Sequence, residues 1–206
     1  MTERVVFVVD DDDAVRDSLS LLLEAAGHRV ETFESAARLL ATLTPDRQGC
    51  VIADVRMPGM DGLELQQQLL ARNIRLPVII ITGHGDVPIA VRAMKAGAID
   101  FLEKPFADEA ILDTVRLAFA RNERPRFQHD PEGITGERLA QLTQREREVL
   151  SAMVAGHPNK VIAHLLNISP RTVEIHRARV MEKTGARSLS HLVRLALEAG
   201  VQTEDS

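Results

Sequence analysis

The stretch VVFVVDDDDAVR, residues 5–16, decides the fold of the first half of the chain. A continuous apolar run, Val5–Val9, stands directly before four aspartates and the start of a helical pattern. Such an uninterrupted apolar run suits a strand that is covered on both faces. Aspartates such as Asp12 and Asp13 stabilise the positive N-terminus of a helix. The stretch therefore predicts a buried strand that turns directly into a helix.

The same alternation of strand and helix continues to about residue 121. Further strands are predicted at Arg29–Phe33, Cys50–Ala53, Val78–Ile81 and Ala98–Leu102. Helices are predicted at Ala14–Ala26, Ser35–Leu43, Leu63–Arg72, Val87–Ala96 and Asp108–Arg121. Parallel strands need helical crossovers, so five such units predict an α/β domain with a doubly wound parallel sheet over residues 1–121.

The rest of the chain divides into a linker and an all-helical domain. Residues 122–142 carry prolines and glycines among charged residues and show little periodicity, which predicts a linker. Four helices are predicted over residues 143–206: from the capping box Thr143–Glu146 to about Gly156, at Asn159–Leu166, from Pro170 to about Thr184, and at Ser188–Ala199.

Composition excludes several classes of protein. No apolar run approaches the ~20 residues that cross a bilayer, and the N-terminus lacks a signal-peptide layout. We therefore expect a cytoplasmic protein with no membrane partner. The single cysteine, Cys50, excludes an internal disulfide framework and the usual zinc-finger spacings. Aromatic residues make up 3% of the chain, without Trp or Tyr, which disfavours a base-stacking platform for single strands.

Charge is distributed unevenly between the two halves. Residues 1–120 contain 19 acidic and 12 basic residues, whereas residues 143–206 contain seven acidic and nine basic residues. Five of these basic residues lie close together between Ser169 and Arg187. A locally basic helical segment of this kind points to nucleic acid as a partner of the C-terminal half.

Polar side chains converge on one edge of the predicted sheet. Asp10 and Asp11 follow the first strand, and Asp54 ends the third. Thr82 ends the fourth strand, and Lys104 follows the fifth. Ligands of parallel sheets bind at the carboxyl ends of the strands. Three carboxylates gathered there need a cation, and hard oxygen ligands suit Mg²⁺. A carboxylate, a hydroxyl, a lysine and Mg²⁺ are the parts needed for phosphoryl transfer onto Asp54.

The third C-terminal helix has two different faces. Val173, Val180 and Thr184 share one side and are predicted to be buried. The opposite side carries Arg171, Glu174, Ile175, Ala178, Arg179 and Glu182. This mixture fits a recognition helix in the major groove, where Glu174 accepts from cytosine and Ile175 and Ala178 touch thymine methyls. Phosphate contacts are predicted for Lys160, Arg171, Arg179 and Lys183. A helical module that binds protein remains the alternative.

Several motifs together resemble a known family. Val8-Val-Asp-Asp11, Asp54-Val-Arg-Met-Pro-Gly-Met-Asp-Gly62, Thr82-Gly-His-Gly85, Met94-Lys-Ala-Gly97 and Phe101-Leu-Glu-Lys-Pro-Phe106 resemble the receiver domain of two-component response regulators. The stretch Leu142–Gly200, with Ser169-Pro-Arg-Thr-Val173, resembles the LuxR-type helix-turn-helix. In number, order and spacing, these motifs resemble a FixJ-type regulator of the NarL/FixJ class.

The resemblance implies a flavodoxin-like receiver and roles for individual residues. Asp54 would accept phosphate from a sensor histidine kinase, and Thr82 and Lys104 would contact the phosphoryl oxygens. The carboxylates of Asp10, Asp11 and Asp54, with the main-chain carbonyl of Arg56, would hold Mg²⁺. Thr82 and Phe101 would form the switch, and the Lys104–Pro105 bond would be cis.

For the output domain, the resemblance adds Thr172 to the predicted DNA contacts. Promoter DNA in double-stranded form and RNA polymerase are expected as partners, and the regulator is expected not to be an enzyme. A homodimer is expected when the chain is phosphorylated, because a helix-turn-helix dimer gains affinity by spanning two half-sites about one helical turn apart. Two rivals remain open from the residues themselves. One is a phosphorelay intermediate or adaptor whose helical domain no longer binds DNA. The other is an aspartyl-phosphate hydrolase, although the chain shows neither a cap domain nor a second acid/base carboxylate for it.

Overall fold

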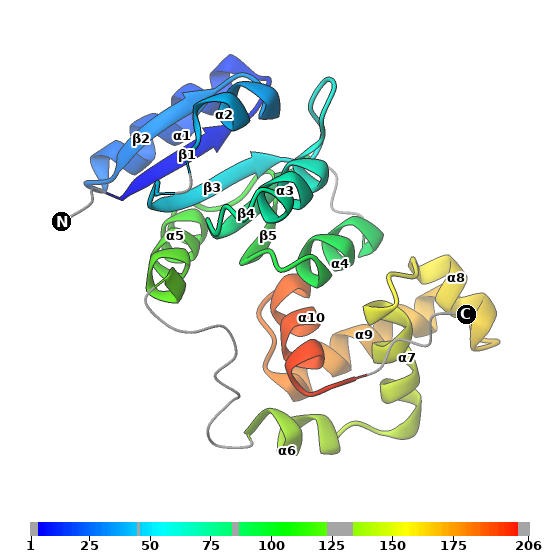
Figure 1. Ribbon diagram of the computed structural model, residues 1–206. Coiled ribbons are helices and arrows are strands. Elements are labelled where there is room, and N and C mark those ends of the chain that lie inside the picture. The colour runs from blue at the N-terminus through cyan, green and yellow to red at the C-terminus, as the bar shows by residue number, and fades with distance from the viewer. Residues whose placement is uncertain (1–3, 45, 84–86, 123–133, 202–206) are drawn as a thin grey trace. The chain divides into compact units, whose positions relative to one another are not determined.

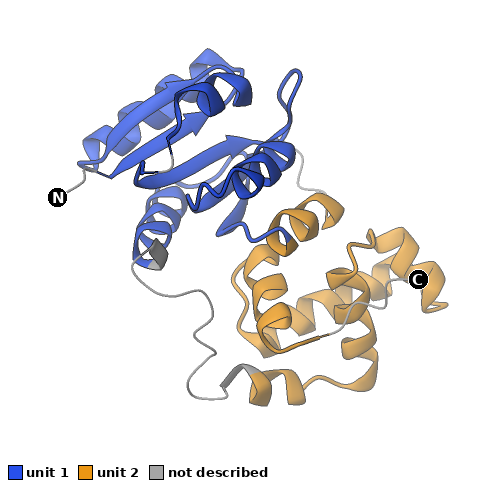
Figure 2. Cartoon of the chain, in the orientation of Figure 1, with its two compact units in different colours: residues 1–84, 96–126 blue, residues 85–95, 127–206 orange. Residues whose placement is uncertain are grey.

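The computed structural model describes residues 4–44, 46–83, 87–122 and 134–201. Contacts between residues divide the chain into two units, shown in Figure 2: residues 1–84 with 96–126, and residues 85–95 with 127–206. The first unit is an α/β structure, and the described part of the second is helical (Figure 1). The predicted fold class of both parts is confirmed.

A parallel sheet forms the centre of the first unit. Its strands are β1 (Val5–Val9), β2 (Arg29–Phe33), β3 (Gly49–Asp54), β4 (Val78–Thr82) and β5 (Asp100–Glu103). Their order in the sheet is β2-β1-β3-β4-β5, and every neighbouring pair is parallel. The first strand starts and ends where the apolar run does, whereas β5 begins at Asp100 rather than at the predicted Ala98.

Helices cover both faces of this sheet because the strand side chains alternate in direction. The helices of the unit are α1 (Asp13–Ala25), α2 (Ala36–Thr42), α3 (Gly62–Ala71) and α5 (Asp108–Asn122). Val6, Val8 and Ile52 pack with residues of α1 and α5 on one face. Cys50 belongs to the same core, where burial raises the pKa of its thiol to about 12. The cysteine therefore acts as a small apolar side chain.

The second unit contains the helices of the C-terminal part together with α4. They are α4 (Val87–Lys95), α6 (Ile134–Ala140), α7 (Gln144–Val154), α8 (Asn159–Leu165), α9 (Pro170–Thr184) and α10 (Leu189–Glu198). The side chains of Thr143, Ser169 and Ser188 cap α7, α9 and α10, and the first of these belongs to the predicted capping box.

Helix α6 is the element that the sequence did not predict. It lies within residues 122–142, the predicted linker, and packs against α9. Its seven residues include Gly136, which weakens helix propensity, so its local signal is poor. Residues 123–133 of the same segment lie outside the described part of the chain.

A buried ion pair fastens α7 to α9. Glu146 is 2% exposed, and its carboxylate accepts a hydrogen bond from the Nζ of Lys183 at 2.7 Å. The same carboxylate accepts from the backbone N–H of Thr143, which completes the capping box of α7. The bond from Lys183, followed by that from Thr143, lowers the pKa of Glu146 to about 2. The folded chain therefore holds this group ionised.

We expect Glu146→Gln to lower the free energy of unfolding by about 1–3 kcal/mol at neutral pH, because Lys183 loses its charged partner. The pKa of Glu146 is about 2 in the folded chain, below its ordinary 4.5, so this contribution is complete above pH 4.5 and disappears toward pH 2. Urea denaturation followed by circular dichroism should show the difference between wild type and variant shrinking over that range.

The matched control is Glu148→Gln, which removes a more exposed pair with Arg145 and should cost at most about 0.5 kcal/mol. A destabilisation by Glu146→Gln that stays constant down to about pH 2 would contradict the role given to this carboxylate.

Candidate functional site

Polar residues meet at the carboxyl edge of the sheet, as the parallel topology predicts. Asp10 directly follows β1, Asp54 is the last residue of β3, and Thr82 is the last residue of β4. All three are buried, with exposed fractions of 1%, 5% and 0%. Lys104 directly follows β5. Two buried carboxylates so placed repel each other unless a positive charge lies between them.

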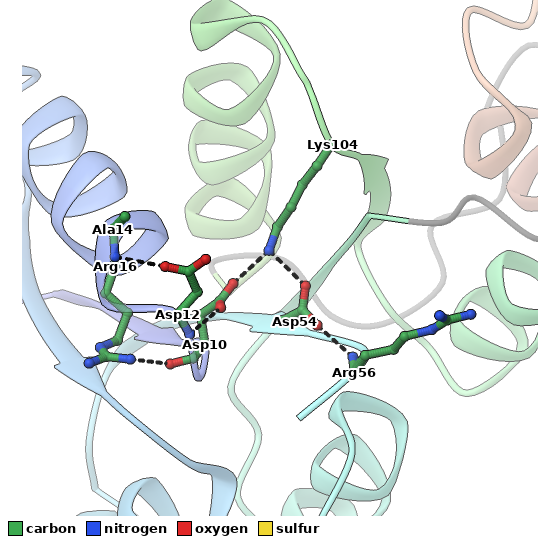
Figure 3. Close-up of polar contacts among 7 residues, drawn as sticks. All are labelled: Asp10, Asp12, Ala14, Arg16, Asp54, Arg56 and Lys104. Atoms are coloured by element: carbon green, nitrogen blue, oxygen red, sulfur yellow. Dashed lines mark hydrogen bonds and ion pairs between the residues drawn. The ribbon is translucent and has the colours of Figure 1, made fainter. Parts of the chain in front are cut away.

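Lys104 supplies that positive charge. Its Nζ donates to Asp10 Oδ2 at 2.7 Å and to Asp54 Oδ1 at 2.8 Å, so one ammonium bridges both carboxylates (Figure 3). Desolvation lowers the pKa of Lys104, but the hydrogen bonds and charges of Asp10 and Asp54 outweigh it and leave the pKa raised. The bridge therefore consists of a charged lysine between two carboxylates.

The loops around Asp54 are held by backbone contacts. Asp54 Oδ2 accepts from the backbone N–H of Arg56 at 2.5 Å. The backbone N–H of Lys104 donates to the carbonyl of Thr82 at 2.7 Å, and the Lys104–Pro105 bond is cis, as expected. Gly62 allows a close approach on the other side, since a Cβ there would lie 2.3 Å from the carbonyl oxygen of Asp54. These contacts leave Asp54 little freedom.

The predicted metal ligands are placed unequally. Asp10 and Asp54 share Lys104, whereas Asp11 lies exposed on the turn after β1. Across the part of the chain that the structure describes, no three His, Cys, Asp or Glu side chains are close enough to hold a metal ion. The donor set, carboxylates with the carbonyl of Arg56, nevertheless has the hard oxygen chemistry that Mg²⁺ prefers. The chemical type of these ligands therefore fits Mg²⁺.

Phe101, the predicted switch aromatic, is 8% exposed. It lies on β5, which pairs with β4, the strand that ends in Thr82. Its backbone N–H donates to the carboxylate of the preceding Asp100 at 2.8 Å. The aromatic ring is therefore packed inward, on a strand hydrogen-bonded to the one that carries Thr82.

Helix α9 presents the two faces that its sequence predicts. Val173, Val180 and Thr184 are buried. Residues exposed on α9 include the predicted DNA contacts Arg171, Glu174, Ile175, Ala178 and Arg179, and Lys160 is exposed on α8. Ile175 is 48% exposed among these charged side chains. An apolar side chain left open in a charged surface suits contact with the thymine methyls of a major groove.

The side chains of Thr172, Arg177 and Lys183 on α9 have partners within the unit. The hydroxyl of Thr172 lies 2.8 Å from that of the N-cap Ser169. Lys183 pairs with the buried Glu146. A DNA contact by Lys183 would therefore compete with that ion pair. Arg177 donates to the side-chain oxygen of Asn159 on α8, so it fastens α9 to α8.

Comparison with known proteins identifies two families along the chain. Residues 6–116 match the response regulator receiver domain, and residues 140–196 match the bacterial regulatory proteins of the luxR family. The transcriptional regulatory protein FixJ of Azorhizobium caulinodans is 54% identical over 97% of this chain and 95% of its own length. FixJ of Rhizobium meliloti is 50% identical over 97% and 98%. The chain belongs to the FixJ-type response regulators.

A solved structure supports the same assignment. Full-length FixJ from B. japonicum shares 46% identity and a TM-score of 0.53, covering 98% of this chain and all of that one. The chain is thus a two-component response regulator, with a receiver and a LuxR-type DNA-binding domain, that regulates transcription. The family is one of transcriptional regulators and is no enzyme class. Among the described helices, none is long and apolar enough to span a bilayer.

Two arginines that hold parts of the structure together were not identified from the sequence. Arg16, on α1, donates to the carbonyl of Asp10 at 2.6 Å, and Arg177 holds α8 against α9. Only the contact of Arg16 with Asp13 had a local signal, because the two are three residues apart at the start of a helix. The other partnerships depend on how the elements pack.

We expect Lys104→Met to lower the free energy of unfolding by about 3 kcal/mol without divalent cations, because Asp10 and Asp54 are left facing each other. Urea denaturation in a chelating buffer measures this cost. The loss of stability caused by Lys104→Met should be much smaller in an Asp54→Asn background, because only one carboxylate then remains beside the missing ammonium.

The control is Arg38→Met, which removes an exposed pair with Glu34 and should cost at most about 0.5 kcal/mol. An equal cost of Lys104→Met in the wild-type and Asp54→Asn backgrounds would show that the lysine does not act through these carboxylates.

Proposed function

We propose that Asp54 accepts a phosphoryl group from a sensor histidine kinase and that this modification controls DNA binding by the LuxR-type domain. The observation that carries the proposal is the Lys104 bridge between Asp10 and Asp54. It places a nucleophilic carboxylate, a second carboxylate and a fixed positive charge at one edge of the sheet. These are the groups that stabilise the charge of a transferring phosphoryl group.

The transfer forms a bond between a carboxylate oxygen of Asp54 and phosphorus, and it breaks the bond from phosphorus to the kinase histidine. Asp10, Asp11, Asp54 and the carbonyl of Arg56 would hold Mg²⁺, which neutralises phosphoryl charge. Lys104 already touches Asp54 and needs little movement to contact the new phosphoryl oxygens. Hydrolysis of the acyl phosphate returns Asp54, so the chain releases only inorganic phosphate.

Thr82 and Phe101 would transmit the change as the switch. Thr82 is the last residue of β4, and its carbonyl accepts from the backbone of Lys104. A hydroxyl drawn toward the phosphoryl group would disturb the packing around β4 and β5. Phe101 lies on β5 and carries no hydroxyl, so its part in the switch would depend on packing alone.

For the output domain we propose binding of promoter DNA by α9. Glu174, Ile175 and Ala178 would read base edges, and Arg171 and Arg179, with Lys160 of α8, would contact phosphates. Thr172 would add a DNA contact while its hydroxyl stays beside that of the N-cap Ser169. Lys183 would contact a DNA phosphate in competition with its ion pair to Glu146.

The proposed assembly is a homodimer of the phosphorylated chain in the cytoplasm, where DNA and RNA polymerase, its further proposed partner, are found. A dimer spans two half-sites about one helical turn apart and so gains affinity. Analytical ultracentrifugation with and without beryllofluoride tests this assembly, and an unchanged mass would contradict it.

We expect acetyl phosphate with Mg²⁺ to add one phosphoryl group to the wild type and none to Asp54→Asn, because the amide is no nucleophile for phosphorus. Intact-mass spectrometry measures the addition. Asp113→Asn, at an exposed carboxylate of α5, is the matched control and should be modified like the wild type. Equal modification of Asp54→Asn would exclude Asp54 as the acceptor.

We expect Arg179→Ala to weaken binding of duplex DNA for all sequences and to reduce the slope of log affinity against log salt by about 1. Glu174→Ala should instead relax preference at one base pair, by about 1–3 kcal/mol. Fluorescence anisotropy over a salt series separates these effects. Arg116→Ala on α5 is the charge-matched control and should leave the slope unchanged. If the wild type shows no salt-dependent binding of DNA, that result would favour the alternative of a helical module that binds protein.

A further inference from the structure

Arg16 contacts Asp10, whose carboxylate shares Lys104 with Asp54. Its Nη1 donates to the backbone carbonyl of Asp10 at 2.6 Å, and its Nη2 pairs with the carboxylate of Asp13. The side chain of Arg16 is 14% exposed, so the guanidinium is largely enclosed. Figure 3 shows the result: Asp10 is held at its carboxylate by Lys104 and at its carbonyl by Arg16.

These contacts close the turn that carries Asp11. The backbone N–H of Asp12 donates to Asp10 Oδ1 at 3.0 Å, and that of Ala14 donates to Asp12 Oδ1 at 2.9 Å. Arg16 therefore links Asp10, which precedes Asp11, to Asp13, which follows it. The backbone of Asp11 is therefore fixed on both sides, while its side chain stays exposed.

The i,i+3 pair with Asp13 stabilises the start of α1, but helix stability does not account for the second bond of Arg16, to the carbonyl of Asp10. Arg16 lies near the N-terminus of α1, where the helix dipole disfavours a positive side chain. A planar guanidinium, however, donates in two directions at once, here to a carbonyl and to a carboxylate. That geometry suits a residue whose task is to hold the turn.

We propose that Arg16 is a positioning residue for the magnesium site, holding the Asp10–Asp13 turn so that Asp10 and Asp11 present their carboxylates toward Asp54. The inference rests on the proposed function, since it concerns the ion required there. Arg16 itself touches neither the ion nor the phosphoryl group. It acts through the carbonyl of Asp10, in the way that partners of metal ligands orient those ligands.

The test compares Arg16→Met with Asp13→Asn in the full chain, with Mg²⁺ binding measured by calorimetry. Arg16→Met removes both contacts and should raise the dissociation constant for Mg²⁺ by about 10–100-fold, as loss of a ligand's partner does elsewhere. Asp13→Asn leaves the bond to the Asp10 carbonyl and should stay within about twofold of the wild type. Equal losses in the two variants would assign the effect to the ion pair and overturn the proposal.

A second readout needs no metal. In a chelating buffer, amide hydrogen exchange at Asp12 and Ala14 should be faster in Arg16→Met than in Asp13→Asn, because only the former frees the Asp10 carbonyl. Exchange and Mg²⁺ affinity both equal to the wild type would refute a positioning role. Should Arg16→Met not fold, Arg16→Gln decides: its side chain is two bonds shorter and cannot carry a donor to the Asp10 carbonyl, so unchanged Mg²⁺ affinity would refute the proposal.

The outcomes also separate this inference from the proposed function. If the wild type binds Mg²⁺ and is phosphorylated, and the Arg16→Met variant does both equally well, only the inference about Arg16 is refuted. If the wild type binds no Mg²⁺, both the inference and the proposed function are refuted.

Discussion

One lysine ammonium shared by two buried carboxylates is the interaction on which the structure of the site depends. Burying Asp10 and Asp54 a few ångströms apart is unfavourable unless a cation lies between them. Lys104 takes that place at 2.7 and 2.8 Å. The requirement explains why the first, third and fifth strands must be parallel and in register, since only then do their carboxyl ends meet. Under the proposed function, a phosphoryl group on Asp54 would change the charge that Lys104 faces.

The two domains use their charges differently. In the receiver, Lys104 and Arg16 are both directed at the acidic edge. In the LuxR-type domain, Arg177 and Lys183 hold helices together, whereas Arg171 and Arg179 remain exposed on α9. A basic cluster in a sequence thus overstates the charge available to a nucleic acid, because part of it is paired within the domain. The exposed remainder determines the proposed DNA contacts.

The sequence predicted those parts of the structure whose signals are local. The run Val5–Val9 and the capping box Thr143–Glu146 set the bounds of β1 and the start of α7 almost to the residue. The meeting of Asp10, Asp54 and Lys104 at one edge followed from parallel topology. Their hydrogen-bond pattern did not, because it joins residues 94 and 50 positions apart. The partner of Glu146 and the helix α6, with Gly136 inside it, likewise depend on packing that no local pattern reports.

The central claim is that modification of Asp54 controls the DNA-binding domain. Its most direct test is the affinity for a duplex, selected by the full chain from a random pool, with and without beryllofluoride and Mg²⁺ at constant salt. For the wild type, beryllofluoride should tighten binding by about 5–150-fold, the usual range of coupling between sites. Asp54→Asn should show no change. Equal affinity of the wild type in both states, or an equal gain in Asp54→Asn, would contradict the account.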